Sequence, residues 1–184
     1  SSTSRGLGDV YKRQGLSLGE PDFNTPEFIK DAAVQAVQDN WNSYSPVDGY
    51  ADLKTAICNK FKRDNNLDYN PTQIVVSTGA KQSIANICMV LLNPGDEVLL
   101  PAPYWVSYSA IATLAEAKSI IIPSSIETDF KITPEQLEAA ITPKTKLVMF
   151  NSPNNPSGTI YSEKEYRSLG CLLYTSPSPR DVEE

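Results

Sequence analysis

The sequence of 184 residues contains no histidine. Without histidine, the chain cannot form a Ser-His or Cys-His catalytic triad from its own residues, and a zinc site is disfavoured. The sequence also lacks a long apolar run of the kind that spans a bilayer. Lys and Arg number 16 against 22 Asp and Glu, and this acidic balance argues against a general nucleic-acid binder. We therefore expect a protein with neither membrane nor nucleic-acid partners.

Cysteine is also scarce, with three residues in the chain. Cys58 and Cys88 lie in apolar helical patterns, where a free thiol behaves as a small core residue. Nothing in the sequence supports a disulfide between them. A reducing, cytoplasmic environment is therefore expected.

The two ends of the chain do not have the character of folded protein. Residues 4–14 and 171–181 both resemble translations of a transposase-type sequencing adapter. A DNA sequence that encodes the tail, when reverse-complemented and shifted by one base, encodes S-R-G-L-G-D-V-Y-K-R, which is the beginning of the chain. We therefore expect residues 1–14 and 171–184 to be adapter-derived and not native, and we take residues 15–170 as the genuine sequence.

Between these ends, strand-like and helix-like segments alternate. Apolar strands are predicted at residues 73–77, 97–100, 119–122 and 145–150, and helices at residues 80–92, 104–117 and 133–141. Two amphipathic helices precede them, the first starting at Thr25-Pro26-Glu27 with Thr25 as the cap and the second containing Leu53 and Phe61. The alternation predicts parallel βαβ units and a doubly wound α/β sheet. The fully apolar strands suit a sheet that is covered on both faces.

Residues 77–82, which read S-T-G-A-K-Q, join a predicted strand to a predicted helix. Free backbone N–H groups at the start of a helix form a phosphate site, and the small Gly79 and Ala80 let an anion approach the backbone. Many strand–helix turns contain glycine and bind nothing, so this signal is weak by itself. The turn lacks the full G-x-x-x-x-G-K-[ST] pattern, which argues against a nucleotide P-loop.

Two further turns follow predicted strands and carry candidate ligand groups. Trp105 comes after Pro103-Tyr104, and its indole face could stack on a flat, electron-poor ring; a core or interface tryptophan is the alternative. Asn155 lies in the run N-S-P-N-N-P-S-G at residues 151–158, and its amide could hydrogen-bond a ligand oxygen; a turn-forming asparagine is the alternative. Strand ends of this kind are where open α/β folds place their ligands.

Two candidates lie nearer the beginning of the chain. Gly19 precedes a polar turn in L-G-E-P-D-F, where it would allow a ligand to approach the backbone closely. Tyr44, in S-Y-S-P, offers a hydroxyl group. A plain turn and a surface tyrosine are the respective alternatives.

The order and spacing of these motifs resemble a known family. Residues 15–170 are similar to the first part of a class I, fold-type I aminotransferase of the bacterial aspartate aminotransferase type, which uses pyridoxal 5'-phosphate (PLP). Seven ordered blocks carry the resemblance: L-G-E-P-D-F, Y-S-P-V-D-G-Y-A-D-L-K, V-S-T-G-A-K-Q-S, N-P-G-D-E-V, P-Y-W-V-S-Y, I-T-P-K-T-K and N-S-P-N-N-P-S-G. The last block resembles the N-P-x-N-P-[ST]-G signature of the family.

The resemblance implies a fold and a division of the chain. Residues 15–44 would be an N-terminal arm or small-domain segment. Residues 45–170 would be part of the PLP-binding large domain, with its doubly wound, mostly parallel sheet. The large domain would be incomplete in this chain.

The resemblance also implies roles for cofactor-binding residues. The backbone amides of Gly79, Ala80 and Lys81 would hold the PLP phosphate. Trp105 would stack on the pyridine ring and border the substrate. Asn155 would hydrogen-bond the 3-oxygen of the ring and help to fix the substrate carboxylate.

Further implied roles concern the substrate and a second subunit. The backbone of Gly19 would meet the α-carboxylate of the substrate. Tyr44 would reach the phosphate of the neighbouring subunit, because the family's active sites lie at the interface of a homodimer. Family members often carry cis prolines at the positions of Pro103 and Pro156, which would orient Trp105 and Asn155.

The activity that the resemblance implies is transfer of an amino group between an L-amino acid, expected to be aspartate, and a 2-oxo acid such as 2-oxoglutarate (class 2.6.1.-). None of the lysines in the chain lies in a motif that resembles the family's Schiff-base site. That lysine is both the imine partner of PLP and the base of the reaction. We therefore expect this chain to be an inactive N-terminal part of such an enzyme.

Other functions share many of the same blocks. An aromatic or prephenate aminotransferase and a PLP-dependent carbon–sulfur lyase are alternatives within PLP enzymes. A PLP-binding transcription regulator with an aminotransferase-like domain is an alternative of another class. It would carry a winged-helix region ahead of L-G-E-P-D-F, and no such region precedes that block here.

Overall fold

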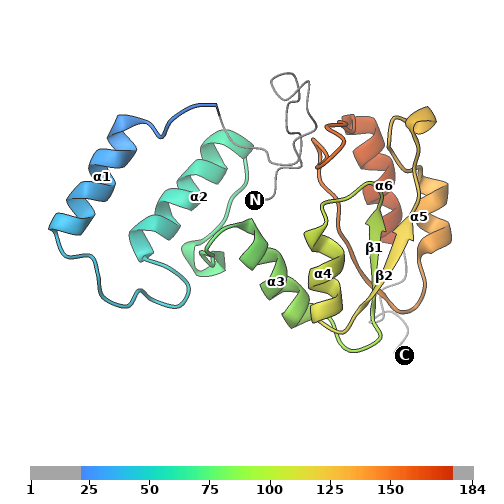
Figure 1. The fold of residues 1–184 in the computed structure, drawn as a ribbon, viewed down its shortest axis with the longest axis horizontal. Coiled ribbons are helices and arrows are strands. Elements are labelled where there is room, and N and C mark those ends of the chain that lie inside the picture. The colour runs from blue at the N-terminus through green and yellow to red at the C-terminus, as the bar shows by residue number, and fades with distance from the viewer. Residues whose placement is uncertain (1–21, 176–184) are drawn as a thin grey trace, which may run out of the picture. The chain divides into compact units, whose positions relative to one another are not determined.

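The computed structural model describes residues 22–175, and the chain divides into two compact units at Val47 and Asp48. The first unit contains α1 (Glu27–Gln38). The second contains all the other elements, in the order α2 (Ala51–Asn65), α3 (Ala80–Leu91), β1 (Glu97–Pro101), α4 (Ser107–Leu114), β2 (Lys118–Ile122), α5 (Pro134–Ala140), β3 (Thr145–Val148) and α6 (Glu163–Thr175) (Figure 1). Two short 3-10 helices lie at Pro71–Gln73 and Ile126–Thr128.

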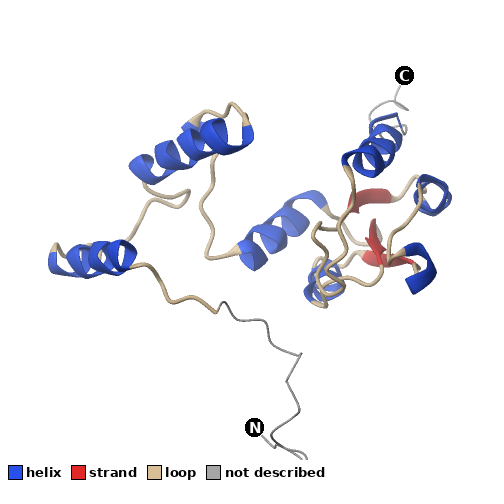
Figure 2. Cartoon of the chain, turned by 90° about the horizontal axis from the view of Figure 1, so that it is seen from above, coloured by secondary structure: helices blue, strands red, loops and turns tan. Residues whose placement is uncertain are grey.

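The second unit is built on a parallel sheet with the strand order β2-β1-β3. Strand β1 pairs with β2 from Glu97 opposite Lys118 to Pro101 opposite Ile122, and with β3 on its other edge. Figure 2, which views the chain from above, shows the strands of this sheet in red with blue helices around them. This arrangement confirms the predicted α/β class with a parallel sheet.

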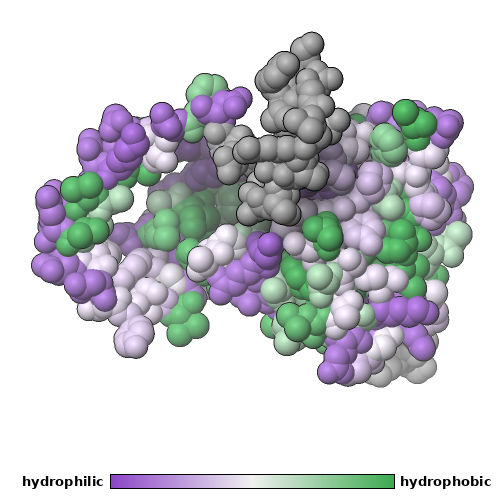
Figure 3. Space-filling model, in the orientation of Figure 1, coloured by the Kyte–Doolittle hydropathy of each residue, from purple (hydrophilic) through white to green (hydrophobic). Residues whose placement is uncertain are grey.

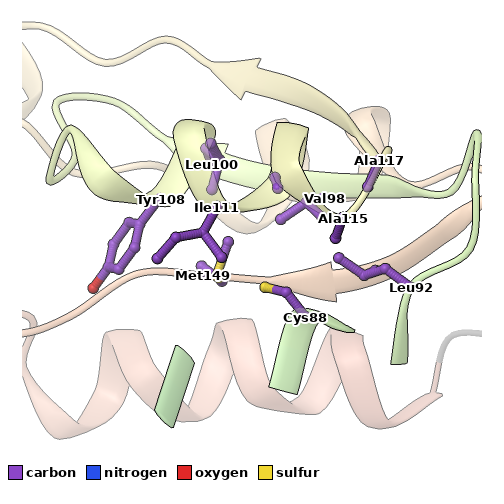
Figure 4. Close-up of a cluster of buried hydrophobic side chains, with 10 residues drawn as sticks. Cys88, Leu92, Val98, Leu100, Tyr108, Ile111, Ala115, Ala117 and Met149 are labelled. Atoms are coloured by element: carbon purple, nitrogen blue, oxygen red, sulfur yellow. The ribbon is translucent and has the colours of Figure 1, made fainter. Parts of the chain in front are cut away.

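Both faces of β1 are covered, as its apolar residues predict, whereas Ile121 of the edge strand β2 is 45% exposed. Val98 and Leu100 face a cluster that includes Cys88 of α3 and Ile111 of α4 (Figure 4). Leu99, which points the opposite way, packs in a second cluster with Leu137 of α5 and Leu169 of α6, among others. The period of two along a strand sends successive side chains to opposite faces. A helix layer on each face therefore buries every residue of β1.

The predicted strand at residues 73–77 is wrong. Gln73 ends the 3-10 helix, and residues 74–77 form no strand ladder within residues 22–175. Ile74 has extended backbone angles, and Val76 N–H donates to Asp48 O at 3.1 Å. The other backbone bonds of the segment, from Ile74 N–H to Pro71 O and from Gly79 N–H to Ser77 O, are local turns. Apolar, β-branched residues favour an extended backbone, whereas a strand also requires a neighbouring chain to pair with.

Helix boundaries differ from the predictions in two places. Pro26 is itself the residue that precedes α1, and Thr25 makes no side-chain cap, contrary to expectation. The predicted helix at 104–117 is shorter, because residues 104–106 belong to the turn after β1 and Glu116 has a left-handed φ of 59°. Left-handed backbone ends a helix.

The start of α6 is held by a reciprocal cap. Ser162 N–H donates to Glu165 Oε2 at 2.6 Å, and Glu165 N–H donates to Ser162 Oγ at 3.3 Å. Lys131 Nζ lies 3.2 Å from Glu165 Oε1. Hydrogen bonds with the side chain and backbone of Ser162, followed by the Lys131 ammonium, lower the pKa of Glu165 to about 2. This carboxylate thus stabilises the helix start in its ionised form.

We predict that Glu165→Gln reduces the loss of stability in acid. A carboxyl whose folded pKa is depressed from 4.5 to about 2 contributes stability above pH 4.5 and loses it as the pH falls to 2. The difference in urea midpoint between parent and variant should therefore be largest near pH 6 and shrink toward pH 2. Glu163→Gln is the control, because among the described residues Glu163 pairs only with Arg167, whose side chain is equally exposed. If both variants follow the same pH profile, the capping role assigned to Glu165 is wrong.

Candidate functional site

Two turns meet at one edge of the sheet. Because β1 and β3 are adjacent and parallel, their carboxyl ends lie on the same side. The residues that follow β1, numbers 102–106, form the β1 turn, which carries Trp105. The residues 151–159, which follow β3, form the β3 turn, which carries Asn155. The fold thus places both predicted residues at the edge where open α/β sheets bind ligands.

The start of α3 presents unpartnered backbone donors. Gly79 precedes the helix with φ 84° and ψ 162°, a region that is essentially confined to glycine. Its carbonyl accepts from the N–H groups of Gln82 and Ser83, whereas within residues 22–175 the N–H groups of Ala80 and Lys81 have no acceptor. A Cβ at Gly79 would meet nothing within 4 Å. Free N–H groups beside open space at a helix start are suited to an anion.

The side chain of Lys81 connects the start of α3 with the β1 turn. Lys81 Nζ lies 5.1 Å from the centroid of the half-buried Trp105 ring, within the range of a cation–π contact. Tyr108 meets the same ring edge-on, with centroids 5.6 Å apart and planes at 87°. Burial raises the pKa of the Tyr108 phenol, which therefore stays neutral. These two contacts hold the indole in one orientation.

Asn155 lies exposed in the β3 turn. Its backbone N–H points to Asn151 Oδ1 at 3.5 Å, and its side-chain amide has no hydrogen-bond partner in the described part of the chain. The preceding residue, Asn154, is tied into the turn by bonds with Thr159 and Gly158 at 2.8 Å each. The Asn155 amide is therefore available to a ligand while its backbone is fixed.

Three X-Pro bonds near the site are cis. They precede Pro103, Pro153 and Pro156. The resemblance led us to expect the first and the third, and the structure confirms both. The second was not anticipated.

The other two predicted residues fall outside this geometry. Gly19 lies outside the described residues. Tyr44 belongs to the first unit, where its side chain is fully exposed. The site described here therefore consists of the start of α3, the β1 turn and the β3 turn.

Sequence reasoning missed two residues that shape the site. Tyr108 follows Trp105 by three positions, a helical spacing that could have indicated contact between the rings. Asn154 donates from Nδ2 to Pro103 O at 3.2 Å and so joins the β3 turn to the β1 turn. No local pattern signals a contact between residues that are 51 positions apart.

No helix among the described residues is long and apolar enough to cross a membrane. No group of three or more His, Cys, Asp or Glu side chains in residues 22–175 could hold a metal ion.

A parallel sheet with free N–H groups at a helix start and an aromatic ring at its carboxyl edge defines an α/β domain of the kind that is suited to a phosphate-bearing ligand. Comparison with known families makes this class more specific. The chain belongs to the family described as aminotransferase class I and II, which it matches over residues 12–174.

Individual relatives agree with this assignment. The chain is 52% identical over 163 residues to an aspartate/prephenate aminotransferase of Nitrosomonas europaea, covering 89% of this chain and 41% of that protein. It is 49% identical over 160 residues to an aspartate aminotransferase of Bacillus subtilis, covering 86% and 41%. The crystal structure of the aspartate aminotransferase from Rhizobium meliloti superposes with a TM-score of 0.83 at 49% identity, covering 86% and 40%. The chain therefore spans about two fifths of the length of these relatives.

We predict that Gly79→Ala destabilises the second unit by about 1–3 kcal/mol, the cost of placing a side chain in a glycine-only backbone region. No atom lies near the new Cβ, so the loss would come from the backbone alone. Urea unfolding followed by far-UV circular dichroism measures the change. The control, Gly170→Ala, adds a methyl group to open space on α6 and should be neutral or stabilising. Equal stability of the parent and the Gly79 variant would show that this turn is not strained.

Proposed function

We propose that this chain is the part of a PLP-dependent aminotransferase that binds the cofactor, and that the full-length protein exchanges an amino group between an L-amino acid and a 2-oxo acid. The observation that carries the proposal is the convergence of the α3 start, Trp105 and Asn155 at one edge of the sheet. Membership in the aminotransferase family supports it independently.

The start of α3 fits the phosphate of PLP. Ala80 and Lys81 offer two free backbone N–H groups, and the open space beside Gly79 admits a phosphoryl oxygen close to the main chain. The positive end of the 12-residue helix and the nearby Lys81 ammonium both favour a dianion. We assign Gly79, Ala80 and Lys81 to the phosphate.

The two turns fit the remainder of the cofactor. We assign Trp105 to stacking on the pyridine ring, because its indole is already held by Tyr108 and Lys81 and needs little ordering on binding. We assign Asn155 to the 3-oxygen of the ring, because its exposed amide can donate a hydrogen bond there. Trp105 and Asn155 would also border the substrate.

When bound, PLP supplies an electron-withdrawing ring that takes up electrons from the substrate's Cα. The residues of this chain hold and orient that ring and restrict the access of water to one side of it. No lysine in the chain lies in a Schiff-base motif, so we propose that these 184 residues bind the cofactor without catalysing transfer.

Residues outside the described site complete the proposal. We assign the backbone of Gly19 to the α-carboxylate of the substrate, and the Tyr44 hydroxyl to the phosphate bound by a second subunit of a homodimer. The fully exposed Tyr44 is free to serve a partner. Exposed apolar side chains of the second unit, such as Val75, Val90 and Val106, also favour a partner surface. Apolar residues are visible among the polar ones on the face drawn in Figure 3. The free cysteines Cys58 and Cys88 favour the cytoplasm.

Among amino-acid donors, we propose aspartate, with 2-oxoglutarate as the acceptor. Relatives of 52% and 49% identity are named aspartate/prephenate aminotransferase and aspartate aminotransferase. The name of the first relative includes prephenate, and we therefore propose prephenate as a further acceptor of the amino group. We rank an aromatic donor, a carbon–sulfur lyase and a transcription regulator below this function.

The cofactor part of the proposal predicts a saturable change in the fluorescence of Trp105. Trp41→Phe leaves Trp105 as the only tryptophan of the chain. Titration with 4-deoxypyridoxine 5'-phosphate, which lacks the aldehyde and cannot react with surface lysines, should quench it with a defined midpoint. Pyridoxine, which lacks the phosphate, should bind at least about tenfold more weakly, because charge-assisted hydrogen bonds to the phosphate are lost.

Competition by inorganic phosphate would show that the phosphate of the ligand occupies an anion site. Quenching that never saturates, or that is the same with and without the phosphate, would contradict the cofactor assignment. Replacing Lys81 with Met is a further check, because it removes the ammonium group but keeps the backbone donors. Binding should weaken without being lost.

The substrate part of the proposal is tested on the full-length protein. Its rate of transfer from aspartate to 2-oxoglutarate and to prephenate is compared with its rate from phenylalanine, with the 184-residue chain as the control. We expect aspartate to be the better donor and the shorter chain to show no transfer. A preference for phenylalanine would replace the aspartate assignment, and transfer by the shorter chain would overturn its proposed inactivity.

A further inference from the structure

Asn154 is the residue that joins the two ligand-bearing turns. Its Nδ2 donates to Pro103 O of the β1 turn at 3.2 Å. Its Oδ1 accepts from the N–H and the hydroxyl of Ser157, at 3.1 and 2.9 Å, within the β3 turn. Its backbone N–H and carbonyl are also bonded within the β3 turn. The side chain thus has one end in each turn.

The orientation of the Asn154 amide is fixed by chemistry. Both donors of Ser157 point at one amide atom, which must be the oxygen because the amide nitrogen cannot accept them. The nitrogen then faces Pro103 O, which can only accept. In the described part of the chain this is the only hydrogen bond between residues 102–106 and residues 151–159. One side-chain amide therefore sets the distance between the two turns beyond the ends of their strands.

We infer that Asn154 is a positioning residue, which keeps Trp105 of the β1 turn at a fixed position relative to Asn155 of the β3 turn. The inference rests on the proposed function, in which Trp105 offers a stacking face and Asn155 a hydrogen-bond donor to the same ligand. Asn154 does not need to touch that ligand. Its half-buried side chain donates to the β1 turn and accepts from the β3 turn.

The inference distinguishes Asn154 from its neighbour Asn151. Asn151 is also half-buried and also donates from Nδ2 to a proline carbonyl, Pro153 O, at 2.9 Å. That bond stays within the β3 turn, across two residues, whereas the Asn154 bond spans 51. Asn154→Asp and Asn151→Asp therefore make the same chemical change, replacing an N–H donor by a carboxylate oxygen that faces a carbonyl. They differ in whether a bond between the turns is lost.

The experiment uses the 184-residue chain with Trp41→Phe, so that the indole N–H of Trp105 gives a single signal in a nitrogen–proton correlation spectrum. The first readout is the position and width of this signal without ligand. The second is the affinity for 4-deoxypyridoxine 5'-phosphate, from quenching of Trp105. Circular dichroism and the thermal midpoint monitor the fold in each variant.

We expect Asn154→Asp to shift or broaden the Trp105 indole signal and to weaken ligand binding by about tenfold, the effect of losing one hydrogen bond and exposing a carbonyl to repulsion. Asn151→Asp should leave the signal in place and change affinity by less than about twofold. Equal effects of the two variants on both readouts, with the fold intact, would overturn the inference.

Two further outcomes are separated by the design. If the parent chain does not bind the ligand, the proposed function fails for this chain, and the ligand-free indole signal alone decides the role of Asn154. If Asn154→Asp lowers the folded fraction, Asn154→Ala replaces it, because this change removes the amide that donates to Pro103 O without placing a charge against that carbonyl. An unchanged indole signal in Asn154→Ala would then overturn the inference.

Discussion

The burial of β1 between two layers of helices is the constraint on which the rest of the second unit depends. Val98, Leu99 and Leu100 are fully buried, and each contributes about 1.5–3 kcal/mol relative to exposure to water. Because these side chains alternate between the two faces, a shift of one residue would exchange the two cores. The register of β1 against β3 is therefore strongly fixed. That register determines where the β1 and β3 turns begin.

The candidate site at the end of these strands contains side chains that are held in place and hydrogen-bond donors that have no acceptor within residues 22–175. The Trp105 ring contacts Lys81 and Tyr108, and Asn154 is bonded to both turns. In contrast, the N–H groups of Ala80 and Lys81 and the side chain of Asn155 have no partner within residues 22–175. Fixed elements that carry free donors are a preorganised arrangement, in which binding costs little reorganisation.

The sequence predicted the parts of this fold that depend on local pattern. The apolar residues 98–100 indicated a strand that is buried on both faces, as β1 is, and Gly79 indicated the turn into α3. The failures have a common cause. Residues 74–77 have the composition of a strand but pair with no neighbour in the described part of the chain. The bond from Asn154 to Pro103 likewise joins positions that no local pattern relates. Pairing and long-range contacts depend on what folds beside a segment, and a single sequence does not contain that information locally.

The position of β3 in the sheet has a consequence for the order of assembly. Strands β1 and β2 are joined by α4 and lie side by side, so they can pair as soon as both have left the ribosome. Strand β3 comes later in the chain and adds to the opposite edge of β1. During synthesis the β1 turn would therefore exist before the β3 turn arrives to complete the site. A nascent chain that ends before β3 would pair one edge of β1 with β2 and leave the other edge open to pairing with the wrong strand.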